Sequence, residues 1–311
     1  MATRMQRFEE TKRPALAHPR LVLVTRSTEY ERLIERHATP QQAAFFLSTR
    51  GQALEPIRAD HEAFEQARRL VFGAAPHAWR RAQVKREDLD RFLFEPEDIV
   101  VVLGQDGLVA NVSKYLDGQP VIGCNPDPRR NEGVLVPCPP QAAADLMRAA
   151  AAGRGRFEAR TMVEARRDDG QALVALNEIY IGHRTHQSSR YELAFGEASE
   201  RQSSSGLIVA TGTGATGWVR SIARERASKT RLPGPAEPRL AFFVREAWPS
   251  VATGASITEG LLDEARTLML TSRMEEEGCV FGDGIETDRL AFGWGRKVEV
   301  RVASRVLRLM R

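Results

Sequence analysis

A carboxylate inside a glycine turn is the first group in this chain that suits chemistry. The turn Gly104-Gln105-Asp106-Gly107 follows directly on DIVVVL at 98–103, an apolar run typical of a buried strand. In an open α/β sheet, ligands bind at the carboxyl ends of strands, where glycine lets backbone N–H groups approach a phosphate. A carboxylate beside phosphates is unfavourable by charge alone, so Asp106 would hold a metal or accept a proton from an attacking hydroxyl. A plain Asp-Gly turn explains the same residues equally well.

Two further carboxylates lie in the second half of the chain. Asn177-Glu178 ends the segment ALVALNE, and its amide and carboxylate suit a base edge and ribose hydroxyls. Gly282-Asp283-Gly284 again places a carboxylate in a glycine turn. Taken alone, a solvated strand end accounts for Asn177 and Glu178, and for Asp283 a plain turn is as good an interpretation.

A threonine- and glycine-rich segment is the third feature. The sequence SSGLIVATGTGATGW at 204–218 predicts a strand, a loop and then a helix. Such a loop presents hydroxyls and backbone N–H groups at a helix N-terminus, which favours binding of an anion or nucleotide. Trp218 would stack on a base or fill the core, and the core is the commoner role for a lone tryptophan.

The first half of the chain reads as α/β. Apolar runs predict strands, and apolar spacing of helical period predicts helices. The charged segment 82–91 (AQVKREDLDR) is expected to be a solvated helix or loop. Strand, glycine turn, helix and strand from 98 to 124 form a βαβ unit with a parallel sheet. We expect strands at 20–25, 98–103 and 120–124, and helices at 27–37, 40–48, 60–72 and 108–116.

The second half reads as mostly β. After an alanine-rich helix at 140–152, short segments alternate apolar and polar residues. The predicted architecture is an N-terminal α/β domain at 1–139, followed by a β-rich domain at 140–311. We expect strands at 157–163, 172–181, 191–195, 206–210, 240–245, 267–271, 298–302 and 306–310.

Composition excludes several classes of protein. The 311 residues are 42% hydrophobic and 28% charged, as in a globular protein. No run approaches the roughly 20 apolar residues of a membrane span, and the polar N-terminus has no secretory core, so we expect a cytoplasmic protein. The net charge of +4 is too small and dispersed for nucleic acid. The three cysteines are widely spaced and odd in number, and His183 and His186 lack further ligands nearby, which argues against a disulfide framework and a structural metal site.

In their order along the chain, these motifs resemble the ATP-NAD kinase family, and most closely its mitochondrial-type branch. GQDG stands where the family has G-G-D-G, and the order continues with PVIGCNPDPRRNEG, LNEIYIG, SSRYE, SSGLIVATGTGATGW, FFVREAW and GDG. The resemblance covers roughly residues 20–290. Gly212 replaces the proline of the T-P-T-G form in the ordinary bacterial branch, which favours the mitochondrial type.

The resemblance implies transfer of the γ-phosphoryl group of ATP, with Mg²⁺, to the 2′-hydroxyl of the adenosine ribose of NAD. It implies that NAD lies in the cleft between the domains, and that the protein is a homodimer or higher homo-oligomer. Asp106 would orient and deprotonate the hydroxyl. NAD would be held by Asn177, Glu178, Ser205, Thr211, Thr213, Gly214, Thr216 and Asp283. The ATP side would comprise Gly104, Gln105, Gly107 and Asn125.

Gln105 departs from the family pattern, which has glycine at this position. If the backbone there needs a positive φ or a close approach to phosphate, the side chain costs about 1 kcal/mol or obstructs the donor. Two alternatives to an NAD kinase therefore stay open: a catalytically weak NAD-binding sensor, and a related lipid or sugar kinase, which shares the G-G-D-G turn but lacks the other motifs. The donor, ATP or polyphosphate, is also open.

Overall fold

The computed structural model describes residues 8–9, 15–128 and 132–311 and divides the chain into two compact units. The α/β unit comprises Phe8–Tyr115, Gln119–Phe157 and the last four residues, Arg308–Arg311. The β unit comprises Leu116–Gly118 and Glu158–Leu307. The change of unit thus follows Phe157 and not residue 139. The reason is that α5 packs through Ala143, Met147 and Ala150 into the core of the α/β sheet.

Parallel strands form the sheet of the α/β unit, in the order β5-β4-β2-β3. The end of β17 adds to this sheet, since Arg308 and Leu309 pair in parallel with Pro120 and Val121 of β5. The strands predicted at 20–25, 98–103 and 120–124 are confirmed, and their side chains are almost all buried. The strands are β1 (Phe8–Glu9), β2 (Arg20–Thr25), β3 (Arg80–Lys85), β4 (Asp98–Leu103) and β5 (Pro120–Cys124).

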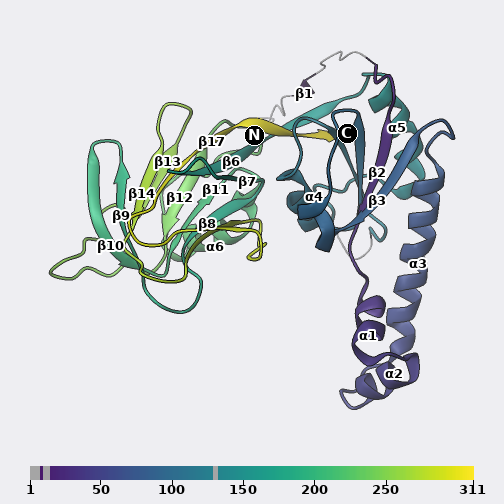
Figure 1. The fold of residues 1–311 in the computed structure, drawn as a ribbon, viewed down its shortest axis with the longest axis horizontal. Helices are drawn as coiled ribbons and strands as arrows, with labels where there is room; N and C mark the ends of the chain where they lie inside the picture. The colour runs from purple at the N-terminus through teal and green to yellow at the C-terminus, as the bar shows by residue number, and fades with distance from the viewer. Residues whose placement is uncertain (1–7, 10–14, 129–131) are drawn as a thin grey trace. The chain divides into compact units, whose positions relative to one another are not determined.

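Helices α3 and α5 pack on the sheet, whereas α1 and α2 lie beside the first turns of α3, away from the strands (Figure 1). A capping box between Thr28 and Glu31 starts α1, and Thr39 with Pro40 starts α2. No helix within the described ranges is both long and apolar enough to cross a membrane. The bounds are α1 (Glu29–His37), α2 (Pro40–Ser48), α3 (Leu54–Gly73), α4 (Asp106–Ser113) and α5 (Ala143–Ala151), with short 3₁₀ helices at Arg86–Arg91 and Pro140–Ala142.

The interpretation of 82–91 as a helix or loop is wrong for its first residues. Arg80–Lys85 is strand β3, which pairs in parallel with β2 at the edge of the sheet. Only Val84 of its side chains is buried, so the apolar alternation that marks most strands is missing. The backbone pairing with β2 outweighs the weak strand propensity of these charged residues.

Two sheets form the β unit. In the first, β10, β9, β14 and β17 pair antiparallel in that order, with β6 beside β17 and β7 beside β6. The second is antiparallel throughout, in the order β13-β12-β11-β8-β15-β16. The strands are β6 (Phe157–Arg167), β7 (Ala172–Ala175), β8 (Glu178–His183), β9 (Ser189–Phe195), β10 (Ala198–Ser204), β11 (Leu207–Ala210), β12 (Leu240–Val244), β13 (Glu259–Leu262), β14 (Leu268–Ser272), β15 (Gly278–Gly282), β16 (Arg289–Ala291) and β17 (Lys297–Met310).

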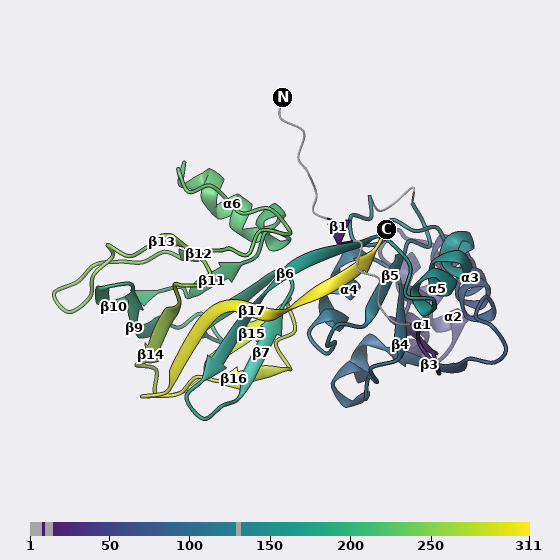
Figure 2. The same cartoon turned by 90° about the horizontal axis from the view of Figure 1, so that it is seen from above.

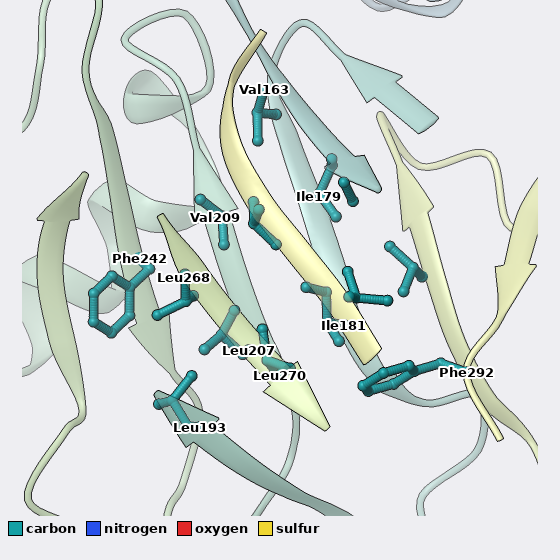
Figure 3. Packing of buried hydrophobic residues seen from close by; sticks show 14 of the residues in the cluster. Val163, Ile179, Ile181, Leu193, Leu207, Val209, Phe242, Leu268, Leu270 and Phe292 are labelled. Atoms are coloured by element: carbon teal, nitrogen blue, oxygen red, sulfur yellow. The ribbon is translucent and has the colours of Figure 1, made fainter. Parts of the chain in front are cut away.

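The facing sides of the two sheets make the core of the β unit (Figure 3). Ile179, Val209 and Phe242 come from the second sheet, and Leu193 and Leu270 from the first, all fully buried. The other face of the second sheet is covered by α6 (Trp218–Glu225), which packs through Val219 and Ile222 (Figure 2). Because both faces of β11 and β12 are covered, these two strands are apolar and buried throughout, and they hold the loops at their ends in place.

Two predicted strand boundaries differ from the structure. The segment 172–181 is broken into β7 and β8 at Leu176-Asn177, whereas the strands predicted at 298–302 and 306–310 are one continuous strand, β17. The break at Asn177 places Glu178 at the beginning of a strand and not at its end. The backbone groups of residues 176 and 177 form hydrogen bonds with Asp283 and Thr211 and not with a neighbouring strand.

Candidate active site

Asp106 is the first residue of α4, directly after β4 and its turn. Gln105 is the N-cap residue, with φ −112° and ψ 166°, which is ordinary extended backbone. The structure therefore places no strain on glutamine at this position. The α4 N-terminus begins without a side-chain cap hydrogen bond. A Cβ at Gly107 would meet no atom within 4 Å.

Both carboxylate oxygens of Asp106 accept hydrogen bonds from the loop that follows β5. Leu135 N–H donates to Oδ1 at 2.8 Å and Val134 N–H to Oδ2 at 3.1 Å. The loop returns closely here, because Gly123 has no room for a Cβ, which would lie 1.9 Å from the Leu135 carbonyl oxygen. A carboxylate has about four acceptor positions, so two remain for a ligand hydroxyl. The two hydrogen bonds therefore orient the Asp106 carboxylate and leave it able to accept further hydrogen bonds.

Asn125 follows β5 and hydrogen-bonds to the same loop, which runs back past Gly123. Its N–H donates to the Cys138 carbonyl at 2.8 Å, and its Oδ1 accepts from Asp127 N–H at 3.0 Å. The side chain is buried at 3% exposure. The predicted donor-side residues Gly104, Gln105 and Asn125 thus all lie at the carboxyl ends of β4 and β5.

A cavity of about 440 Å³ opens beside this turn within the α/β unit. It brings in two arginines that the sequence interpretation missed, Arg26 at the end of β2 and Arg32 on α1. Burial lowers the pKa of Arg26, and the charges of Arg32 and Arg86 lower it further, against the opposite pull of Glu87. Neighbouring guanidinium groups repel one another and favour an anion between them. The lining is Arg26, Ser27, Thr28, Glu29, Arg32, Ile57, Ala59, Asp60, His61, Ala63, Phe64, Gly104, Gln105, Pro126 and Asp127.

In the β unit, the Asn177-Glu178 pair and the threonine loop pack directly on each other. Thr211 N–H donates to the Asn177 carbonyl at 2.9 Å, and Thr211 Oγ1 donates to the Leu176 carbonyl at 2.5 Å. Gly214 has no room for a side chain, because a Cβ there would lie 2.1 Å from the Asn177 carbonyl oxygen. Two segments separated by more than 30 residues therefore form one cluster.

Asp283 binds the backbone of this cluster from a third segment. Its Oδ2 accepts from Leu176 N–H at 2.8 Å and its Oδ1 from Asn177 N–H at 2.7 Å. Its own N–H donates to the Glu178 carbonyl at 3.1 Å. These bonds pair the backbone that the break between β7 and β8 leaves outside the ladder. Asp283 has a φ of 53°, in the left-handed region that Asp tolerates better than most residues.

Glu178 is the carboxylate of this cluster whose charge is most perturbed. Burial raises its pKa to about 7, and the negative charge of Asp283 contributes in the same direction. At neutral pH the group is therefore present in both protonation states. A carboxyl group of this kind is typical of a ligand site, although ion-pair networks produce similar shifts.

A buried ion pair supports the threonine loop. Arg160 and Glu158 on β6 lie 2.9 Å apart with side-chain exposures of 3% and 2%. Arg160 Nη1 donates to Thr213 Oγ1 at 3.2 Å, and Thr213 N–H donates to Thr211 Oγ1 at 3.0 Å. The sequence interpretation missed this pair, because two charges in a strand ordinarily indicate a solvated face.

Ser205 and Trp218 belong to the segment 204–218 but do not lie in the cluster formed by its threonine loop. Ser205 lies beyond the opposite end of β11 from Thr211, where its N–H donates to the Arg245 carbonyl. The structure therefore does not bring Ser205 together with Asn177 and Glu178. Trp218 is 39% exposed and stacks on Tyr180 at 6.4 Å between ring centroids, so it is not simply a core residue.

Metal-ligating residues do not cluster in the parts of the chain that the structure describes: no group of three His, Cys, Asp or Glu there could hold an ion.

Comparisons with known proteins agree on one family. No family model matches the chain. A rat protein named mitochondrial NAD kinase 2 is 27% identical over 73% of this chain and 73% of its own length. An NAD kinase of Methylococcus capsulatus is 35% identical over 40% of this chain and 44% of its own.

Solved structures agree in fold. An NAD kinase from Archaeoglobus fulgidus in complex with ATP has a TM-score of 0.55 at 17% identity, covering 94% of this chain and 93% of that one. Yeast NADH kinase complexed with NADH has a TM-score of 0.54 at 14% identity, covering 94% and 82%. The resemblance to the NAD kinase family, its mitochondrial type included, is thus confirmed in sequence, and the fold is that of NAD kinases.

Proposed function

We propose that this protein is an NAD kinase, which transfers the γ-phosphoryl group of ATP to the 2′-hydroxyl of the adenosine ribose of NAD and releases NADP and ADP. The observation that carries the proposal is the carboxylate of Asp106, held by two backbone N–H groups at a helix N-terminus beside an arginine-lined cavity. The NAD kinases among its relatives support the same reaction.

Asp106 acts on the acceptor hydroxyl. The 2′-hydroxyl donates a hydrogen bond to the carboxylate, which orients its oxygen toward the γ-phosphorus and takes the proton as the new bond forms. In a loose phosphoryl-transfer transition state the proton leaves late, so a weak base suffices and positioning does most of the work. The hydrogen bonds from Val134 and Leu135 supply that positioning.

The donor's phosphates bind in the cavity beside the turn, whose lining combines two arginines with Glu29, Asp60 and Asp127. Arg26, Arg32 and the N-terminus of α4 all favour a polyanion there. Mg²⁺ binds in proteins through one or two carboxylates together with substrate phosphates, and the cavity lining contains Asp60 and Asp127. These carboxylates fit a Mg²⁺ ion carried in with ATP, which would neutralise charge on the transferred group.

Removing the charge of Arg26 should weaken binding of the donor ATP and leave binding of the acceptor NAD unchanged. We expect Arg26→Gln to raise the KM for ATP by about 10- to 100-fold, as the loss of a charge-assisted contact of about 1.5–3 kcal/mol implies. The KM for NAD should change less than twofold. Arg36→Gln, on the exposed last turn of the same helix as Arg32, is the matched control. Equal effects on both KM values would contradict a donor role.

The acceptor binds to the cluster in the β unit. Glu178 and Asn177 hold the ribose hydroxyls and the base edge, while the hydroxyls and N–H groups of Thr211, Thr213, Gly214 and Thr216 bind the remaining polar groups of NAD. For Asp283 the structure supports an indirect part, since both its oxygens accept from the backbone of residues 176 and 177. Ser205 is not part of the proposed NAD site, because it lies at the opposite end of β11 from this cluster.

Stability should fall with pH because of Glu178. Its pKa is about 7 in the folded protein, against 4.5 ordinarily, so the folded state binds a proton more tightly than the unfolded state. The contribution is present in full below pH 4.5 and is lost as pH rises through 7, with a total of about 3 kcal/mol. Glu178→Gln should therefore raise the free energy of unfolding at pH 8 and change it little at pH 4, measured by urea denaturation. The same pH dependence in wild type and variant would assign it to another group.

The function is tested by incubating the purified protein with NAD, Mg²⁺ and ATP and measuring NADP with an NADP-specific dehydrogenase. NADP formation is the expected result. If neither ATP nor polyphosphate supports it while NAD still binds, the protein is a sensor and not a kinase.

A homodimer or larger homo-oligomer and a cytoplasmic location are further parts of this proposal. Sedimentation velocity of the purified protein tests the first, and fractionation of cells tests the second.

A further inference from the structure

We propose that the β unit carries a second ligand site, which binds a mononucleotide: a planar base together with a phosphate group. The site is a cavity of about 500 Å³ that shares no residue with the Asn177–Thr216 cluster or with Asp283. Its volume lies in the range of small-molecule sites, about 300–1,000 Å³. It is lined by Arg190, Tyr191, Arg201, Gln202, Ser203, Trp248, Ser250, Ala252, Thr253, Arg273 and Trp294.

Two exposed indoles form its apolar walls. Trp248 is 44% exposed and Trp294 is 59% exposed. They come from separate segments, the connection after β12 and the turn between β16 and β17. Indole faces left open to solvent at the border of a cavity are suited to stack on a base, which every nucleobase permits because each has a π-face.

Positive charge faces the same cavity. Arg190, Arg201 and Arg273 line it, and no carboxylate does. Arg273 donates to Glu192 Oε2 at 3.1 Å and lies 5.5 Å from the Trp294 ring centroid, while its Nε is buried with no acceptor among the described residues. Among those residues Arg190 and Arg201 form no side-chain ion pair within 4 Å. Arginine forks of this kind bind phosphate groups.

The buried amide of Gln202 does not belong to this set, although the residue borders the cavity. Gln202 pairs with Tyr191, a core residue, so its side chain lies on the opposite face of β10 from those of Arg201 and Ser203. Its Nε2 donates to Glu200 Oε1 at 2.5 Å and to the Ile257 carbonyl at 2.9 Å, outside the cavity lining. The indoles and the arginines are therefore the protein groups that match a base and a phosphate here.

Binding of AMP, measured by calorimetry against adenosine and inorganic phosphate, tests the proposal. We expect AMP to bind at least tenfold more tightly than either part alone, and more weakly as salt is raised. Arg201→Gln and Trp294→Ala should each weaken this binding at least tenfold while KM values for NAD and ATP change less than twofold. Arg239→Gln, an exposed arginine of the same unit that does not line the cavity, is the control.

Other outcomes overturn the site. If AMP binds equally to wild type, Arg201→Gln and Trp294→Ala, it binds elsewhere. If the two variants instead dissociate an oligomer in sedimentation velocity and leave AMP binding unchanged, the cavity is an interface between copies of the chain. The readout is binding, so it stands apart from the NAD kinase assay.

Discussion

Asp106→Asn is expected to lower kcat for NADP formation by about 10²- to 10⁴-fold, the range that general-base catalysis supplies. The amide has the shape of the carboxylate but does not accept the hydroxyl proton. It also places an NH₂ group against one of the two N–H donors, Val134 or Leu135, so orientation is lost together with basicity. NAD binding, measured by calorimetry, should persist because the NAD contacts proposed above lie in the β unit, apart from the one 2′-hydroxyl contact with Asp106.

Asp145→Asn is the matched control, since this aspartate lies on α5 with 83% of its side chain exposed. It should change kcat less than twofold. An Asp106→Asn protein that retains wild-type turnover would remove Asp106 from the chemistry. A wild-type protein with no turnover to lose would favour the sensor alternative.

Variants of the buried ion pair Glu158–Arg160 are expected to affect the free energy of unfolding and NAD binding separately. Arg160→Met alone should destabilise the protein by about 3–5 kcal/mol, because it removes the guanidinium that lies 2.9 Å from the buried Glu158 carboxylate. The double variant Glu158→Leu with Arg160→Met should be about as stable as wild type, since apolar residues often replace a buried ion pair without loss. Urea denaturation measures both values.

The double variant should still bind NAD about tenfold more weakly. Arg160 donates to Thr213 Oγ1, and the variant removes this bond, so the threonine loop loses a fixed hydroxyl that the packing of Leu and Met does not restore. Thr213→Val should then weaken NAD binding less in the double variant than it does in wild type. A double variant with the wild-type KM for NAD would show that the ion pair serves stability alone.

The sequence by itself determined the class of fold and the main chemical motif. Short apolar runs such as 98–103 and 120–124 are buried on both faces, so composition alone marks them as strands of a parallel sheet. The GQDG turn was placed correctly at the carboxyl end of β4, because the turn is local and its residues are consecutive. The order of the motifs along the chain indicated a resemblance to the NAD kinase family, which the relatives confirm in sequence and the solved structures in fold.

Local patterns were insufficient where pairing decides the structure. Strand β3 has a charged sequence and is a strand through its bonds to β2. The break between β7 and β8 interrupts an apolar run that reads as continuous, because Asp283 and Thr211 bind the backbone there. Such partners are more than 30 residues away, and their effect is invisible in a sequence window.

Only the tertiary structure decided which side chains surround each motif. Arg26 joins the donor cavity because β2 lies beside β4, and Arg160 of β6 hydrogen-bonds Thr213 across 53 residues of sequence. Ser205 is separated from Thr211 by the length of β11, although only five residues lie between them. Gln105 has ordinary extended backbone, so the strain that a positive φ would cause there is absent, and this dihedral angle could not be read from the residue type. The physical reason is common to all four cases: a residue's type limits its chemistry, whereas its neighbours follow from how distant strands pair and pack.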